Sequence, residues 1–255
     1  MSRTNAIHPQ CYARVLHDCS DKLSREHYVS ASVLQLLGDE HTIANASWLP
    51  PGQQSDPLPT GALGSRILCQ RHNEALSPLD AHAKIFFTEL LRALSKNEQA
   101  PNRQVSVDGD CLEQWVLKAC CGTLASGNLV EKGQAIVREP PRNWLEILFC
   151  GSPGKQGTGL YIRQAQMTPH LGYAIGPVYV EETCVGGGIE FAGVEFFVLL
   201  DSGGKNRIFE QSTGEVSHLV YRPGAIRIES QTRTTQIELE WQTWTPSEGV
   251  RYRRS

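Results

Sequence analysis

The sequence predicts an α+β fold in which a zinc-stabilised N-terminal module with helices precedes a mostly antiparallel β-rich domain. Three observations lead to this prediction. Cysteine and histidine residues within the first 80 positions have the spacing of metal ligands, a strongly amphipathic segment follows them, and strand-like alternation dominates after about residue 145. We therefore divide the chain into a module at 1–100, a helical connector at 101–145 and a β-rich domain at 146–255.

Composition and charge narrow the classes of protein that this chain can be. It has 255 residues, with 24 Lys and Arg against 27 Asp and Glu, a formal net charge of -3. This balance excludes a broadly basic nucleic-acid binder, so any phosphate contact must be local. No apolar run approaches the roughly 18 residues of a membrane span, and residues 1–9 lack the apolar core of a secretory signal. We expect a cytoplasmic protein with reduced thiols and no membrane partner.

One segment has strong helix signals. Ser77 is a candidate N-cap and Pro78 suits the first helical position, which predicts a helix that begins there. Its apolar stripe consists of Leu79, Ala83, Phe86, Phe87, Leu90, Leu91 and Leu94. A shorter helix is predicted over 30–37, with Gly38 as its stop. In the connector, Cys111, Cys120 and Cys121 lie among apolar residues at helical spacing and are interpreted as core residues.

Strand signals dominate the second half of the chain. Ile237 and Leu239 alternate with charged residues, and so do Ile226 and Ile228, as expected for half-buried strands. The apolar run at 144–149 is also interpreted as a strand, ending at Cys150. Together these runs predict five to seven strands in a sheet or sandwich.

The candidate metal ligands come from two separate segments. Cys69 and His72 have the spacing C-x-x-H, a tight turn that can place both side chains on one Zn²⁺. Cys11 and Cys19 can supply the other two ligands of a tetrahedral structural site. His8 or His17 can replace one of these cysteines, so the full ligand set stays open.

Two motifs together resemble the zinc-bearing type of the HNH (ββα-metal) endonuclease superfamily, over about residues 11–80. They are Glu26-His27, and Cys69-x-x-His72-Asn73 with His in place of the usual last Cys. The resemblance implies that His27 is the general base that activates water for attack on a phosphodiester. It also implies that Glu26 and Asn73 hold a catalytic Mg²⁺ or Mn²⁺. The substrate class implied is nucleic acid, with DNA favoured.

The sequence also departs from the family pattern. The first cysteines are separated by seven residues instead of two, no Asn precedes Cys69 at the family's middle position, and Tyr28 begins an altered loop after His27. The alternative is therefore a catalytically degenerate zinc scaffold that binds nucleic acid or protein. Candidate phosphate contacts near the motifs are Lys22, Arg25, Arg66 and Arg71. The β-rich domain is a candidate surface for a protein partner or a homo-oligomer.

Overall fold

The computed structural model shows an α+β chain that forms two compact units. The first unit comprises Met1–Ala81 and Leu117–Pro153, and the second comprises His82–Val116 and Gly154–Ser255. Helices α2 (Gln70–Leu94) and α3 (Gly109–Ser126) contribute residues to both. The structure describes residues 6–44, 46–50, 52–95, 102–131, 134–136, 138–152, 154–164, 170–180, 183–200, 218–230, 232–242, 244–246 and 248–253.

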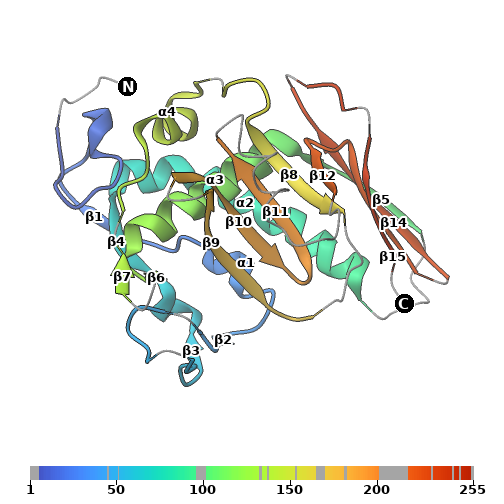
Figure 1. The fold of residues 1–255 in the computed structure, drawn as a ribbon, viewed down its shortest axis with the longest axis horizontal. Coiled ribbons are helices and arrows are strands. Elements are labelled where there is room, and N and C mark those ends of the chain that lie inside the picture. Colours follow the sequence, from blue (N-terminus) through green and yellow to red (C-terminus); the bar gives the residue numbers. More distant parts are fainter. Residues whose placement is uncertain are drawn as a thin grey trace. The chain divides into compact units, whose positions relative to one another are not determined.

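The first unit is built around two antiparallel strands and the helix that follows them. β1 (Leu23–Glu26) pairs with β4 (Ser65–Cys69), with Leu23 opposite Cys69, and α2 begins at the residue after Cys69. Figure 1 shows the two strands side by side and α2 continuing from β4. The order β1, β4, α2 is a ββα arrangement. Its smaller elements are η1 (Arg14–Leu16), α1 (Ala31–Leu34), β2 (Glu40–His41), β3 (Leu58–Pro59), η2 (Thr60–Leu63), β6 (Leu129–Glu131), β7 (Gln134–Ile136) and α4 (Arg142–Cys150).

The second unit contains two sheets. The five-stranded sheet is antiparallel throughout, in the order β12-β8-β11-β10-β9. The four-stranded sheet has the order β15-β13-β14-β5, in which β13 and β14 are antiparallel and both outer pairs are parallel. The strands are β5 (Arg103–Asp108), β8 (Gly159–Gln164), β9 (Tyr173–Val180), β10 (Thr183–Phe191), β11 (Val194–Leu199), β12 (His218–Tyr221), β13 (Ala225–Glu229), β14 (Thr234–Glu240) and β15 (Val250–Arg253).

Aromatic side chains fill the core of the second unit. Phe87 of α2 lies 5.0 Å from Trp115 of α3 and 4.4 Å from Phe191 of β10, measured between ring centroids. Phe86 lies 5.6 Å from Phe196 of β11 in an edge-to-face contact. The apolar stripe predicted for α2 therefore packs on the five-stranded sheet. The predicted α+β class with antiparallel sheets is confirmed.

Two predicted element types or boundaries are wrong. The run 144–149 is not a strand but the centre of α4, where Trp144, Leu145 and Leu148 are buried at helical spacing and Gly151 ends the helix in a left-handed conformation (φ 64°). Helix α2 begins at Gln70 instead of near Pro78, so Pro78 lies inside it. Because proline has no N–H, the carbonyl of Glu74 loses its helical partner there.

Candidate metal centre

The four predicted zinc ligands come together in the first unit. Cys11 and Cys19 lie on either side of η1, Cys69 is the last residue of β4, and His72 lies in the first turn of α2. All four side chains are buried, and their donor atoms lie within 4.8 Å of one another. The strand–helix junction thus supplies two ligands, and the N-terminal segment supplies the other two.

The distances between donor atoms fit one small ion. Zn–S bonds of about 2.3 Å and Zn–N bonds of about 2.0–2.1 Å place sulfur and nitrogen ligands about 3.5 Å apart in a tetrahedral site. From Nδ1 of His72, the Sγ atom of Cys11 lies at 3.5 Å, that of Cys69 at 3.1 Å and that of Cys19 at 4.0 Å. The observed values bracket the expected one. A buried group of three cysteines and one histidine can therefore hold a metal ion such as zinc.

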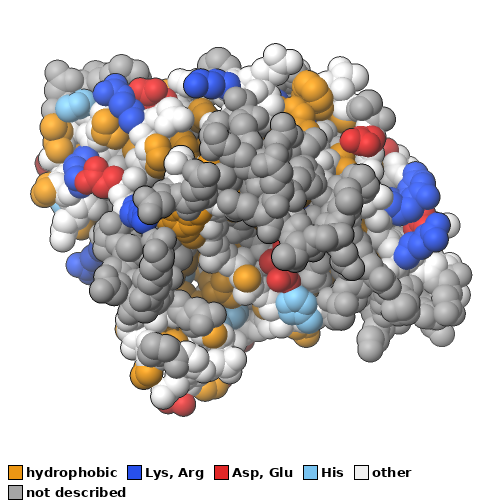
Figure 2. Space-filling model, viewed as in Figure 1, with side chains coloured by type: hydrophobic (Ala, Val, Ile, Leu, Met, Phe, Trp, Pro, Cys, Tyr) orange, Lys and Arg blue, Asp and Glu red, His pale blue; other side chains and the backbone are white. Residues whose placement is uncertain are grey.

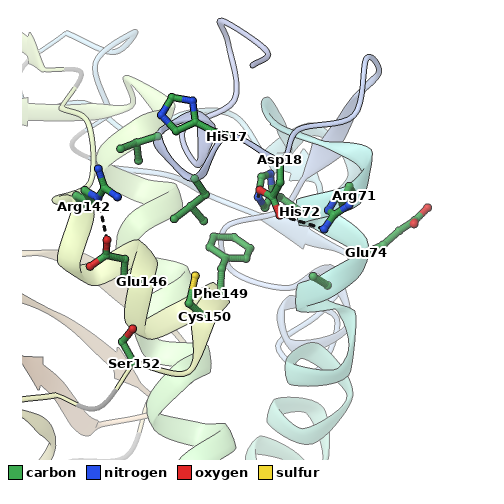
Figure 3. Close-up of a pocket in the computed structure, with 13 residues that line it drawn as sticks. His17, Asp18, Arg71, His72, Glu74, Arg142, Glu146, Phe149, Cys150 and Ser152 are labelled. Carbon is green, nitrogen blue, oxygen red and sulfur yellow. Dashed lines mark hydrogen bonds and ion pairs between the residues drawn. The ribbon is translucent and has the colours of Figure 1, made fainter. Parts of the chain in front are cut away.

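A carboxylate orients the histidine of this group. Nε2 of His72 lies 2.8 Å from Oδ1 of Asp18, and the other carboxylate oxygen lies 3.1 Å from the guanidinium of Arg71. Figure 3 shows Asp18 between the two side chains. A proton on Nε2 shared with Asp18 leaves the lone pair of Nδ1 directed at the thiols, as metal-binding histidines require. Burial lowers the pKa of His72 in spite of Asp18, which favours the neutral ring.

Backbone N–H groups surround the sulfur atoms. The N–H of Ser20 donates to Sγ of Cys69 at 3.4 Å. Burial by itself raises the pKa of Cys69, but hydrogen bonds from the N–H groups of His72 and Ser20 outweigh it and lower the pKa below its usual value. Burial raises the pKa of Cys11 and of Cys19. A bound divalent cation offsets this cost because it stabilises the thiolate form of each ligand.

A cavity of about 1140 Å³ lies beside the centre, between the η1 segment, α2 and α4 (Figure 3). Two of its arginines are in ion pairs, because Arg71 lies against Asp18 and Arg142 lies 2.8 Å from Glu146 one turn further along α4. The ring of Phe149 packs edge-on against His72 at 4.8 Å and covers the ligand from this side.

The three predicted catalytic residues contact different partners and do not contact one another in the described hydrogen bonds. Glu26 is buried, and its Oε1 lies 2.8 Å from Nζ of Lys118. The side-chain amide of Asn73 donates to Oγ of Ser24 at 2.9 Å. His27 follows β1, and a Cβ added at Gly64 would lie 3.2 Å from its ring. No hydrogen bond among the described contacts joins any two of Glu26, His27 and Asn73.

The third predicted catalytic residue, His27, has a partly buried ring. Its Nε2 atom is buried and has no hydrogen-bond partner among the described residues. Burial lowers the pKa of His27, while a hydrogen bond with the backbone of Thr60 acts in the opposite direction. The ring is therefore neutral near pH 7, with one nitrogen held by the backbone.

The catalytic Mg²⁺ or Mn²⁺ implied by the resemblance does not fit these residues. A divalent cation needs carboxylate and amide oxygens that converge on open space. Here the Glu26 carboxylate is bound to an internal ammonium group, so its charge is already neutralised, and the only described side-chain contact of Asn73 is the one from its Nδ2 to Ser24. The structure does not support a catalytic metal at Glu26 and Asn73.

Three of the four predicted phosphate contacts are exposed. Lys22, Arg25 and Arg66 lie on or beside β1 and β4, and none of them forms an ion pair with another described residue. The fourth, Arg71, is half-buried and bound to Asp18. Figure 2 shows that Lys and Arg side chains on the visible face lie in small groups, several beside Asp or Glu.

Two residues that contact predicted site residues were not predicted from the sequence: Asp18, which contacts His72, and Lys118, which contacts Glu26. The position of Asp18 directly before a metal-binding cysteine was the one signal for its role. Lys118 is 1% exposed and stands alone in the otherwise apolar run 115–121.

Protein-family models, curated proteins and solved structures were compared with the chain and gave no match. The resemblance to the HNH superfamily therefore rests on its two sequence motifs alone.

Proposed function

We propose that the first unit is a zinc-stabilised ββα module that binds the phosphates of nucleic acid through the exposed side of β1 and β4. The observation that carries the proposal is the buried group Cys11, Cys19, Cys69 and His72 at the start of α2. Zinc held there fixes β4 and α2 to the N-terminal segment, and it provides the rigidity that a small two-stranded sheet lacks.

The sheet next to this centre carries positive charge. Arg25 lies on β1 and Arg66 on the antiparallel strand β4, both exposed, and Lys22 precedes β1. Exposed Arg and Lys side chains on a rigid sheet are suitable contacts for a phosphate backbone. Since the whole chain is slightly acidic, the contact is local and we expect it to be sensitive to salt.

Phosphodiester hydrolysis is a second candidate function, and one observation favours it. His27 is neutral near pH 7, and its buried Nε2 atom has no partner among the described residues, so the ring can accept a proton at that atom once a water molecule reaches it. The side chain lies beside Arg25 around Gly64, just after β1, which carries Arg25. In this candidate His27 moves the proton and Arg25 positions the phosphate.

The experiment that tests the proposal measures binding of fluorescent duplex DNA, and of RNA of the same sequence, by anisotropy. The proteins are the zinc-loaded wild type, Arg25→Ala/Arg66→Ala and the control Arg142→Ala, whose exposed arginine lies on α4. We expect the double variant to bind more weakly and the control to match the wild type. Equal affinity of all three proteins, or no binding by any, contradicts the proposal.

The same proteins, with His27→Ala added, separate binding from hydrolysis. Supercoiled plasmid is incubated with each protein in Mg²⁺, in Mn²⁺ and in EDTA. Nicking by the wild type that His27→Ala abolishes supports the second candidate. Binding without nicking under all three conditions leaves the module as a binding unit only.

A further inference from the structure

The four-stranded sheet of the second unit has one apolar face and one polar face. Buried and accessible residues alternate along β13, β14 and β15, as Ile226, Arg227 and Ile228 do. The apolar face packs inward, where the hydroxyl of Tyr252 donates to the backbone oxygen of Arg163 in β8. The polar face carries charged side chains whose signs are not mixed evenly.

Three arginines form one corner of the polar face. Arg227 on β13 is in register with Arg251 on β15, and Arg253 lies two residues later on the same strand. Glu229 reaches this group, at 3.4 Å from Arg251 and 3.7 Å from Arg253. Among the described residues, the side-chain partner of Arg227 is the neutral amide oxygen of Gln236, 2.7 Å from Nη2. The three arginines, the basic corner, therefore carry an excess of positive charge.

A hollow of about 330 Å³ lies beside the basic corner. Arg227 and Arg251 both line it, and Glu248 is the one acidic side chain among its lining residues. Two guanidinium groups thus face one carboxylate there. The hollow has room for a further carboxylate side chain that comes from outside the chain.

Two glutamates form the acidic corner of the same face, on β14 beside β5. Glu238 accepts hydrogen bonds from the side-chain amides of Gln104 at 2.6 Å and Gln236 at 3.2 Å. Glu240 accepts one from the hydroxyl of Ser106. Neither glutamate forms an ion pair with another described residue, so both negative charges are left without a cation.

The two corners do not neutralise each other within one chain. Gln236 is in register with Arg227, and its amide stands between Arg227 and Glu238, because its oxygen faces the guanidinium and its nitrogen donates to the carboxylate. Glu238 and Glu240 lie two and four residues further along β14. The opposite charges therefore occupy diagonally opposite corners of one face, with a neutral side chain between them.

A face of this kind is complementary to a second copy of itself. Two such faces can meet about a two-fold axis that is parallel to the sheets and perpendicular to the diagonal. Each corner then meets the opposite corner of the partner, and every contact occurs twice. Complementary charges fix the register of a complex and speed its formation, and salt weakens exposed pairs. Because four strands about 4.8 Å apart form a small face, the complex belongs to the weak, transient class.

We propose that this polar face is a homodimer interface in which the basic corner of each copy binds the acidic corner of the other. The partner is a second copy because one face carries both charges in a self-complementary arrangement. A nucleic acid would contact only the basic corner and would be repelled by Glu238 and Glu240 on the same face. The inference does not depend on nucleic-acid binding by the first unit or on hydrolysis.

The test measures the mass of the full-length, zinc-loaded protein by sedimentation equilibrium, at low and at high salt and up to several hundred micromolar. Two variants each reverse one corner: Glu238→Lys/Glu240→Lys and Arg251→Glu/Arg253→Glu. Lys84→Glu is the control, because it reverses an exposed charge on α2. We expect a wild-type dimer that high salt dissociates. The dissociation constant should rise at least about tenfold in each corner variant, because like charges then face each other, and stay unchanged in the control.

Mixing the two corner variants gives the sharpest comparison. One variant has positive charge at both corners and the other has negative charge at both, so each repels itself and complements the other. We expect an equimolar mixture to form a heterodimer with an affinity close to that of the wild-type dimer. A mixture that stays monomeric overturns the proposal.

Other results also overturn it. They are a wild type that stays monomeric at low salt, corner variants that dimerise like the wild type, and a control that weakens the dimer equally. A monomeric wild type whose binding to duplex DNA falls in Arg251→Glu/Arg253→Glu assigns the basic corner to nucleic acid instead. Circular dichroism checks each fold. If a double variant does not fold, the single changes Glu240→Lys and Arg253→Glu at exposed side chains take its place.

Discussion

Nε2 of His72 lies 2.8 Å from the carboxylate of Asp18, and this contact decides which ring nitrogen faces the cysteine thiols. Asp18 is itself held by Arg71. The contacts therefore continue from the His72 ring through the Asp18 carboxylate to the Arg71 guanidinium, which is partly exposed. The centre therefore includes a residue that is not a ligand.

The first prediction concerns Asp18. Asp18→Asn keeps the size of the side chain but removes the charge that supports the imidazole, so zinc affinity falls by about 10- to 100-fold. Competition with a chromophoric chelator measures the change. Glu74→Gln is the control, because this exposed carboxylate lies two residues after His72 and accepts a hydrogen bond from Gln70. Equal zinc affinity of Asp18→Asn and the control would show that the charge of Asp18 does not support zinc binding by His72.

The second prediction concerns the pH dependence of stability. Burial raises the pKa of Glu26 above the unfolded value, against the effect of Lys118, so the folded state holds this proton more tightly than the unfolded state. The stability due to Glu26 is thus fully present below the unfolded pKa of about 4.5 and is lost as pH rises through the folded pKa. In Glu26→Gln this loss of stability with rising pH does not occur, because glutamine does not titrate.

The measurement is urea unfolding of zinc-loaded wild type and Glu26→Gln at several pH values upward from 4.5. The free energy of unfolding of the variant, relative to the wild type, should increase with pH and then level off. Zinc release at low pH affects both proteins alike, because Glu26 is not among the four ligands. If the free energy of unfolding of the variant, relative to the wild type, is constant or decreases with pH, the pKa of Glu26 is not raised in the folded state.

The third prediction concerns the salt dependence of nucleic-acid binding. If Arg25 and Arg66 each contact one phosphate, each single change to alanine lowers the slope of log affinity against log salt by about 1. Affinity for duplex DNA is measured by anisotropy from low to physiological salt. An unchanged slope in both variants would exclude direct phosphate contacts by these side chains.

The fourth prediction concerns the close approach of α3 to the chain after His27. A Cβ added at Gly122 would overlap Cβ of Tyr28. Gly122→Ala therefore destabilises the protein by about 1–3 kcal/mol, although alanine favours helices over glycine. Chemical denaturation measures this, with Gly176→Ala as the control because its added Cβ meets no atom within 4 Å. Equal stability of the two variants would contradict the close approach.

Local patterns were sufficient to predict some parts of this chain. The type and spacing of Cys69 and His72 indicated a metal site, and the structure brings together with them Cys11 and Cys19, the two cysteines predicted to complete it. The helical stripe of α2 and the alternation of Ile237 and Leu239 in β14 also correspond to buried faces. In each case the signal lies within a few residues of the element it describes.

Other parts depend on contacts between distant segments. The run of α4 is short and apolar, so its periodicity fits a strand or a helix equally well. Strand β5 pairs in parallel with β14, more than a hundred positions later in the sequence, and no local pattern specifies that partner. Lys118 is acceptable in an apolar helix only because Glu26 and Asp80 reach it from elsewhere.

The most direct test of the metal centre is the zinc content of the purified protein, measured by inductively coupled plasma mass spectrometry. Wild type, Cys69→Ser and Cys150→Ser are compared, because Cys150 is an exposed cysteine outside the ligand group. We predict one zinc per chain in the wild type and in Cys150→Ser, and loss of zinc with a lower unfolding temperature in Cys69→Ser. A wild-type protein without bound metal, or a Cys69→Ser protein that keeps its zinc and its stability, would contradict it.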